Sequence, residues 1–163
     1  MRRRPARRTA RVLLLDGAGR LLLFRMTDAT PLWMTPGGGI RKHEPPREAA
    51  ARELWEETGL RVTPDELGPY VAFTEGEADL GWKSGWFEDH YFLHRTAAHE
   101  VDTSGMEDRE RGNTVGHRWW SVAELAATTD AVIPRGLTPL LTDILAGRTP
   151  TEPVRLPWHH AQN

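Results

Sequence analysis

The sequence has 163 residues, 39% of them apolar and 27% charged, which is typical of one folded globular domain and excludes a disordered or fibrous chain. The net charge of −2 argues against a protein built as a whole to bind nucleic acid or an anionic membrane. There is no cysteine, no apolar run near the roughly 18 residues of a membrane helix, and no apolar signal segment, so we expect a cytoplasmic protein with no membrane partner.

The first third of the chain predicts a basic arm followed by a β-hairpin. Residues 1–8 contain five arginines and no large apolar side chain after the first residue, which is typical of a disordered arm. The apolar runs Val12–Leu15 and Leu21–Met26 flank a segment with two glycines, which predicts two strands joined by a turn. Leu32–Met34 predicts a short third strand, ended by a proline and three glycines.

The clearest predicted helix is Pro46–Thr58. Proline is tolerated where a helix begins, and Gly59 suits the left-handed conformation that often ends one. Three further strands are expected at Tyr70–Phe73, His90–His94 and Val115–Trp120.

The last third predicts two helices and an irregular tail. Ser121 and Glu124 have the spacing of a capping box, which starts a short helix. Apolar residues from Leu137 to Leu145 follow the i, i+3, i+4, i+7, i+8 spacing of an amphipathic helix. We therefore expect one domain over residues 9–146, between the arm and a C-terminal tail at residues 147–163.

Three acids of the Pro46–Thr58 helix form a candidate metal site. Glu53, Glu56 and Glu57 stand at i, i+3 and i+4, so their carboxylates converge and repel unless a cation neutralises them. Oxygen ligands of this kind select Mg²⁺ or Mn²⁺. The alternative is a solvated acidic face on which Arg52 pairs with Glu56. The glycines before the helix favour a ligand site, because they let backbone approach a ligand closely.

The segment from Gly38 to Leu60 matches every fixed position of the Nudix box, G-x5-E-x7-R-E-U-x-E-E-x-G-U, where U is apolar. Its residues are Gly38, Glu44 and the run Arg52-Glu53-Leu54-Trp55-Glu56-Glu57-Thr58-Gly59-Leu60. The segments 33–38 and 118–125 also look like this family. The chain thus resembles the Nudix hydrolases over residues 9–146. The resemblance implies an α/β (α+β) fold in which a mixed β-sheet is sandwiched between helices.

The resemblance also implies a reaction, which is the Mg²⁺-dependent hydrolysis of a nucleoside diphosphate linked to another moiety, with Mn²⁺ as a possible substitute. By position, Glu56 and Glu57 resemble the principal metal ligands, assisted by the Gly38 carbonyl. Glu53 resembles a residue that binds a further metal or accepts the proton of the attacking water. Arg52 would hold these acids in place.

Some relatives take the proton acceptor from a later loop instead. In this chain the candidates there are Glu107, Asp108 and Glu110, of which Glu110 is preferred. The alternative is that all three are solvated loop charges.

The substrate is poorly specified by the sequence. Trp82 and Trp86 flank a short loop and could stack a nucleobase, although such aromatics are more often core or hairpin contacts. Arg25, Arg41 and Lys42 could reach phosphates or could be ordinary surface cations.

Two other functions stay open. Hydrolysis at the 5′ end of RNA has the basic arm as its support. A non-catalytic ligand-binding regulator is disfavoured because all three acids of the box are present. The expected partner is a small nucleotide, nucleic acid is disfavoured by the charge balance, and a homodimer is one option for the oligomeric state.

Overall fold

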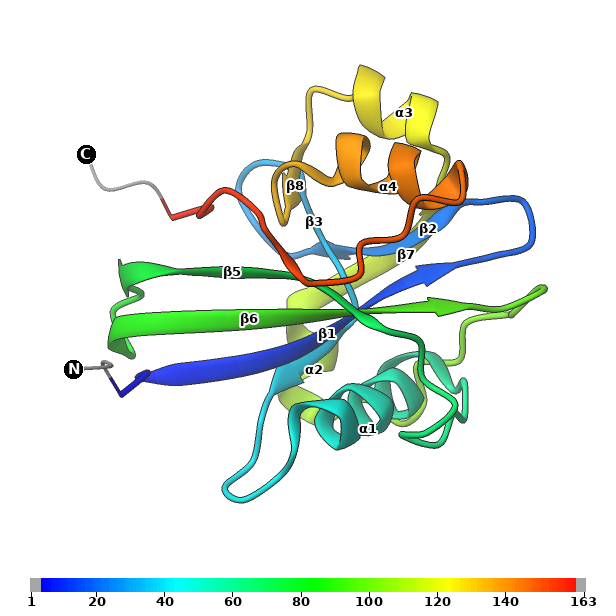
Figure 1. Ribbon diagram of the computed structural model, residues 1–163. Helices are drawn as coiled ribbons and strands as arrows, with labels where there is room; N and C mark the ends of the chain where they lie inside the picture. Colours follow the sequence, from blue (N-terminus) through cyan, green and yellow to red (C-terminus); the bar gives the residue numbers. More distant parts are fainter. Residues whose placement is uncertain (1–3, 161–163) are drawn as a thin grey trace.

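The computed structural model describes residues 4–160 (Figure 1). Over these residues the chain forms nine strands and four helices. The strands are β1 (Arg7–Leu15), β2 (Leu21–Met26), β3 (Leu32–Met34), β4 (Gly37–Gly39), β5 (Tyr70–Asp79), β6 (Ser84–Arg95), β7 (Thr114–Trp120), β8 (Ala131–Ile133) and β9 (Val154–Arg155). The helices are α1 (Pro46–Thr58), α2 (Asp108–Asn113), α3 (Val122–Ala127) and α4 (Leu137–Leu145).

The strands form one mixed sheet with β1 at its centre. The order is β8-β3-β2-β1-β6-β5-β9, and β4 and β7 add to β1 and β2. β1 runs parallel to β6 from Arg7 to Leu15, but it pairs with β2 only where Leu15 meets Leu21. The first half of β1 pairs instead with β4, so the glycines lie beside the start of the central strand.

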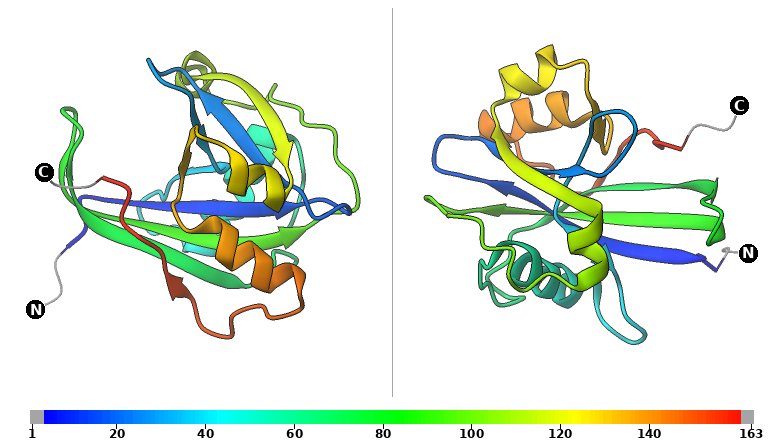
Figure 2. Two further views of the ribbon diagram at one scale, coloured as in Figure 1. Left: turned by 90° about the horizontal axis from the view of Figure 1, so that it is seen from above. Right: turned by 180° about the vertical axis from the view of Figure 1, so that it is seen from behind.

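Helices cover both faces of this sheet. α1 packs against β1 and β4 on one face, whereas α3 and α4 lie together on the other, as both views in Figure 2 show. The predicted arrangement, a mixed sheet between helices, is confirmed.

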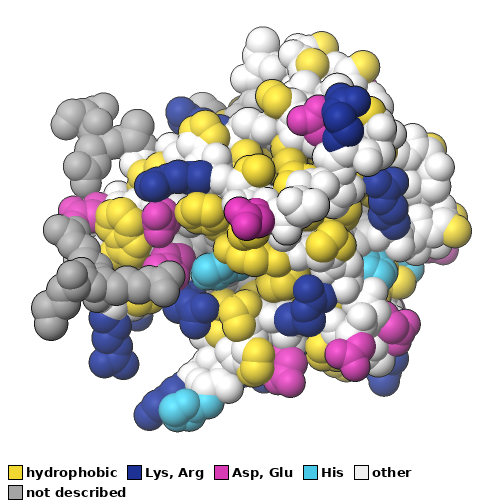
Figure 3. All heavy atoms as spheres, viewed as in Figure 1, with side chains coloured by type: hydrophobic (Ala, Val, Ile, Leu, Met, Phe, Trp, Pro, Cys, Tyr) yellow, Lys and Arg dark blue, Asp and Glu magenta, His cyan; other side chains and the backbone are white. Residues whose placement is uncertain are grey.

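The outer surface carries charges of both signs. Figure 3 shows acidic and basic side chains distributed among apolar ones over the face seen in Figure 1. None of the helices in residues 4–160 is both long and apolar enough to cross a membrane.

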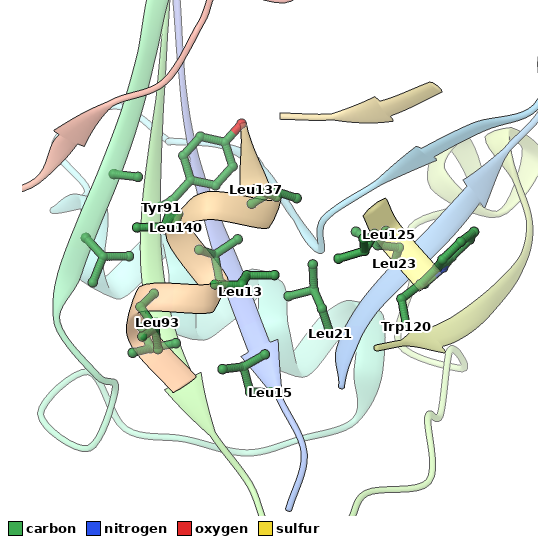
Figure 4. Close-up of a cluster of buried hydrophobic side chains, with 14 of the residues drawn as sticks. Leu13, Leu15, Leu21, Leu23, Tyr91, Leu93, Trp120, Leu125, Leu137 and Leu140 are labelled. Atoms are coloured by element: carbon green, nitrogen blue, oxygen red, sulfur yellow. The ribbon is translucent and has the colours of Figure 1, made fainter. Parts of the chain in front are cut away.

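The two faces have separate apolar cores, because residues of β1 alternate between them. Leu13 and Leu15 pack with residues of α4, and Figure 4 shows Leu13 and Leu93 beside Leu140. Val12 and Leu14 join the other cluster, with residues of α1. β1 is therefore buried on both faces, as its continuous apolar run predicts.

α1 begins and ends where its sequence signals predict. Pro46 is the first helical residue, and Gly59 ends the helix with φ +74° while its N–H donates to the carbonyl of Trp55 at 2.9 Å. The capping box of Ser121 and Glu124 is likewise present at the start of α3.

The two ends of the domain differ from the sequence expectation. β1 begins at Arg7, so two residues assigned to the disordered arm belong to a strand; residues 1–3 lie outside the described part. In the tail, β9 pairs with β5, and the indole N–H of Trp158 donates to the carbonyl of Glu77 at 3.0 Å. Backbone pairing with non-local strands orders both segments, and composition does not report such pairing.

Candidate active site

A cavity of about 490 Å³ lies where α1, β4 and α2 meet. Its wall is formed by the β4 glycines, by acids of α1 and α2, and by residues from the start of β1 and the tip of the β5–β6 hairpin. The cavity therefore joins the predicted box helix to segments that are distant in sequence.

Three carboxylates converge in this cavity. One oxygen each from Glu53, Glu57 and Glu110 lies within 4.8 Å of the others. Glu53 and Glu57 are buried, with 4% and 7% exposure, and Glu110 is partly buried. The buried Oε2 atom of Glu53 has no hydrogen-bond partner in residues 4–160. The group thus has one buried acceptor oxygen that lacks a donor within the described residues.

The crowding of these acids changes their protonation. Burial, with Glu110 nearby, raises the pKa of Glu53 to about 7. Burial and the neighbouring Glu53 raise the pKa of Glu57 well above its usual value, and burial also raises that of Glu110. Without a cation the cluster therefore favours holding protons.

Glu56 lies outside this group of three. Its carboxylate accepts a hydrogen bond from Arg52 at 3.3 Å and lies 3.8 Å from a guanidinium nitrogen of Arg41. The structure thus places Glu57 with Glu53 and Glu110, while Glu56 occupies a cationic environment beside them. Its role as a principal metal ligand stays a prediction.

Arg52 connects α1 to the segment before it. Its guanidinium donates to both oxygens of Glu44 at 2.8 and 2.9 Å, to Glu53 at 3.0 Å and to the Gly39 carbonyl at 3.1 Å. The hydrogen bonds from Arg52 lower the pKa of Glu44. The pairing with Glu56 expected from the i, i+4 spacing is present, but Glu44 and Glu53 are closer partners.

The glycines of β4 touch the acids directly. The Gly37 N–H donates to Glu57 at 2.8 Å. A β-carbon on Gly38 would lie 2.6 Å from Oε1 of Glu53, closer than such atoms approach in folded proteins. Glycine at position 38 therefore allows strand and helix to come close enough for the carboxylate to lie against the backbone.

Of the remaining predicted site residues, some line the cavity and others do not. Trp82 and Arg41 line the cavity, as does Glu107. Arg25 is exposed on β2, and Trp86 is partly buried on β6; neither is part of the lining. The other two, Lys42 and Asp108, also lie outside it.

Three arginines of the cavity wall were not predicted: Arg7, Arg11 and Arg109. The guanidinium carbons of Arg7 and Arg109 each lie 5.3 Å from the centre of the Trp82 ring. Burial, with Arg11 nearby, lowers the pKa of Arg7 below its usual value. In the sequence, Arg7 and Arg11 stand four residues apart, which places both side chains on one face of a strand. This spacing was hidden because residues 1–8 were assigned to a disordered arm.

Comparisons with known proteins identify the family of this chain. The model of the NUDIX domain matches residues 5–141. An RNA pyrophosphohydrolase of Roseobacter denitrificans is 46% identical over 74 residues, which cover 45% of this chain and 44% of that protein. A MutT-like protein of Streptomyces ambofaciens is 49% identical over 59 residues, covering 36% and 38% of the two chains. The chain thus spans less than half the length of either curated relative.

A solved structure shows the same fold at low identity. The MutT protein of Methanosarcina mazei Go1 superimposes with a TM-score of 0.63 and 20% identity, over 90% of this chain and 98% of that one. This likeness shows the fold alone. The NUDIX family model matches residues 5–141, a range that includes the complete box from Gly38 to Leu60. The chain belongs to the Nudix family.

Proposed function

We propose that the chain is a Mg²⁺-dependent hydrolase that cleaves a nucleoside diphosphate linked to another moiety, with Mn²⁺ as a possible substitute. The observation that carries the proposal is the convergence of Glu53, Glu57 and Glu110 beside the β4 glycines. A cavity of about 490 Å³ is also within the range of pockets that hold small ligands.

The residues present fit a divalent cation. Carboxylate oxygens within 4.8 Å of one another are the donors that Mg²⁺ and Mn²⁺ prefer. The buried oxygen of Glu53 without a hydrogen-bond donor has the electron pair that a cation would accept. Glu53, Glu57 and Glu110 would hold the ion, and the family resemblance adds Glu56 and the Gly38 carbonyl. When bound, a divalent ion offsets the charge that builds up on phosphoryl oxygens.

The other side chains supply binding and proton transfer. Arg7, Arg11 and Arg109 line the cavity, and guanidinium groups suit phosphate oxygens. Glu53 or Glu110 would accept the proton of the attacking water. We favour Glu53, because its rigid helix fixes its distance from Glu57. Arg52 would hold Glu53 in position.

A second candidate substrate is the 5′ end of RNA. The Roseobacter denitrificans relative named RNA pyrophosphohydrolase supports it, since the bond cleaved is of the same class. A non-catalytic ligand-binding regulator has less support, because Glu53, Glu56 and Glu57 are all present.

The test is a product assay with Mg²⁺ over a panel of nucleoside triphosphates, dinucleoside polyphosphates, nucleotide sugars and 5′-triphosphorylated RNA. Identifying the products by mass shows which anhydride bond breaks. Release of a nucleoside monophosphate or pyrophosphate from at least one substrate supports the proposal. Tight ligand binding with no turnover of any substrate would support the regulator instead.

A further inference from the structure

We propose that a groove adjoining the catalytic cavity binds single-stranded RNA that leads away from a 5′ end held in that cavity. The groove has a volume of about 500 Å³ and is formed by the start of β1, the loop after β4 and the tip of the β5–β6 hairpin. We call it the basic groove. The proposal rests on the function proposed above for the cavity and extends it to the body of the substrate.

Cations dominate the wall of the basic groove. Its lining includes Arg4, Arg7, Arg8, Arg41, Lys42 and Lys83. Among the described residues of this lining, Glu44 is the one acid, and both of its carboxylate oxygens accept hydrogen bonds from Arg52. Figure 3 shows Lys and Arg side chains at the lower left, where the loop before α1 projects.

Not all of these cations are paired with an acid of the described residues. Arg8 pairs with Glu88 at 3.6 Å, and Arg41 pairs with two glutamates. Lys42 and Lys83 are exposed and form no ion pair within residues 4–160. They can therefore bind an anion without breaking an existing contact.

The basic groove adjoins the catalytic cavity and shares part of its wall. Both are lined by Arg7, Gly39, Arg41 and Trp82. A chain whose terminal phosphates lie near Glu53 and Glu57 would pass these shared residues before it reaches Lys42 and Lys83.

Trp82 stands at this junction with 55% of its surface exposed. The guanidinium carbons of Arg7 and Arg109 each lie 5.3 Å from the centre of its ring. Proteins that bind single-stranded nucleic acid combine a positively charged groove with exposed aromatic rings on which bases stack. The basic groove has both features, whereas an acidic peptide would use only the charges and has no base to stack on the exposed part of the indole.

Backbone pairing holds the groove in shape. The Ile40 N–H donates to the carbonyl of Arg8 at 2.9 Å, and the Ala6 N–H donates to that of Trp86 at 2.7 Å. The loop after β4 and the hairpin are thereby both attached to the start of β1. The net charge of −2 does not reveal this patch, because it sums charges over the whole chain.

Binding is tested without catalysis, using a 12-nucleotide RNA with a 5′-triphosphate and a 3′ fluorophore in excess chelator. Anisotropy gives the affinity as a function of salt for the wild type and for the double variant Lys42→Gln, Lys83→Gln. Each phosphate contact on a single strand contributes about −0.7 to the slope of log K against log salt. The double variant should bind several-fold more weakly, with a slope smaller by about 1.4.

The matched control is Arg135→Gln with Arg148→Gln, which removes the same charge from exposed positions outside the groove. It should keep the wild-type slope. Trp82→Ala should weaken binding about 5- to 150-fold, which corresponds to the loss of one stacked base. Circular dichroism checks that each variant is folded.

Turnover then tests the link to the cavity. With Mg²⁺, kcat/KM of the wild type should rise from a nucleoside triphosphate to 5′-triphosphorylated RNA of two, four and twelve nucleotides. The double variant Lys42→Gln, Lys83→Gln should lose most of this increase in kcat/KM with RNA length.

The proposal is overturned if Lys42→Gln, Lys83→Gln binds RNA as tightly as the wild type, or if the control variant loses as much affinity for RNA. It is also overturned if an acidic peptide of equal charge displaces the RNA. Equal kcat/KM for the mononucleotide and all RNA lengths would also overturn it. Groove-dependent binding without any hydrolysis would instead confirm the groove and refute the proposed function.

Discussion

Arg52 joins three parts of the candidate site through one guanidinium. It holds Glu44 from the loop before α1, Glu53 from α1 and the Gly39 carbonyl from β4. A planar group with fixed donor directions can make these contacts together, whereas lysine presents a single point of charge. We therefore assign Arg52 a positioning role, in which it holds the carboxylates where a cation can bind them.

Arg52→Ala should lower metal affinity about 10- to 100-fold, the usual effect of losing a residue that orients metal ligands. Binding of Mn²⁺, followed by magnetic resonance or calorimetry, measures this directly. Arg61→Ala is the control, because Arg61 is exposed and lies over Trp55, away from the carboxylates. Unchanged metal affinity in the Arg52 variant would show that the acids are positioned without it.

Glu53 and Glu110 are alternative proton acceptors, and their variants distinguish them. If Glu53 accepts the proton, Glu53→Gln should lose about 10² to 10⁴ in kcat at saturating Mg²⁺, while Glu110→Gln should mainly lose metal affinity and keep most of kcat once Mg²⁺ saturates it. Rapid-quench measurement of the hydrolysis step separates this effect from product release. The opposite ranking would assign the base to α2. Small losses in both variants would exclude both residues from that role.

At the scale of elements, the close contact between β4 and α1 depends on a residue without a side chain. In Gly38→Ala the added methyl group would meet the Glu53 carboxylate, which is the mobile end of a side chain. The carboxylate should therefore move while the strand stays in place. A displacement of about 1 Å can cost on the order of 100-fold in rate.

The measurements for this variant are kcat and the melting temperature. We expect a large loss of kcat with little change in melting temperature. Gly112→Ala is the control, because a β-carbon at position 112 meets no atom within 4 Å. Wild-type kcat in Gly38→Ala would mean that the observed position of Glu53 is not needed for turnover.

The burial of Glu53 in α1 also predicts a pH effect on the metal-free protein. Its pKa is raised from 4.5 to about 7 on folding, so between these values the folded state binds more protons than the unfolded state. Stability contributed by this group therefore falls as pH rises from about 4.5 to about 7. Glu53→Gln lacks this titration.

Chemical denaturation of both proteins in chelator tests the effect. The wild type should lose stability relative to Glu53→Gln as pH rises through this window, and Mg²⁺ should restore it at the upper end. A stability difference that does not vary with pH would contradict the raised pKa.

The elements that could be predicted from sequence are those specified by local signals. α1 has proline at its start and glycine at its end, and its bounds were predicted correctly. β5 and β6 are longer than expected, since their polar outer halves are held by pairing with each other. α2 was missed because it is short and has no buried residues. Glu110 could be named as a candidate, but its approach to Glu53 depends on how α2 packs.

At the scale of the whole molecule, the site is an assembly of distant segments on one sheet. β1 brings Arg7 and Arg11 to the cavity that α1 and α2 supply with acids. The box could be recognised from its residues alone. The basic wall could not, because it depends on pairing between β1 and β6 and on the path of the hairpin.

The measurement that tests the central claim most directly is turnover of the best substrate against free Mg²⁺, for the wild type and Glu57→Gln. Glu57 is buried in the cluster and accepts the Gly37 N–H, so its amide variant keeps the size of the side chain and removes the charge. Wild-type activity should vanish in excess chelator and return with Mg²⁺. Glu57→Gln should be folded but slower by at least about 100-fold. Undiminished wild-type activity in chelator, or wild-type rates in Glu57→Gln, would contradict a metal-dependent hydrolase at this site.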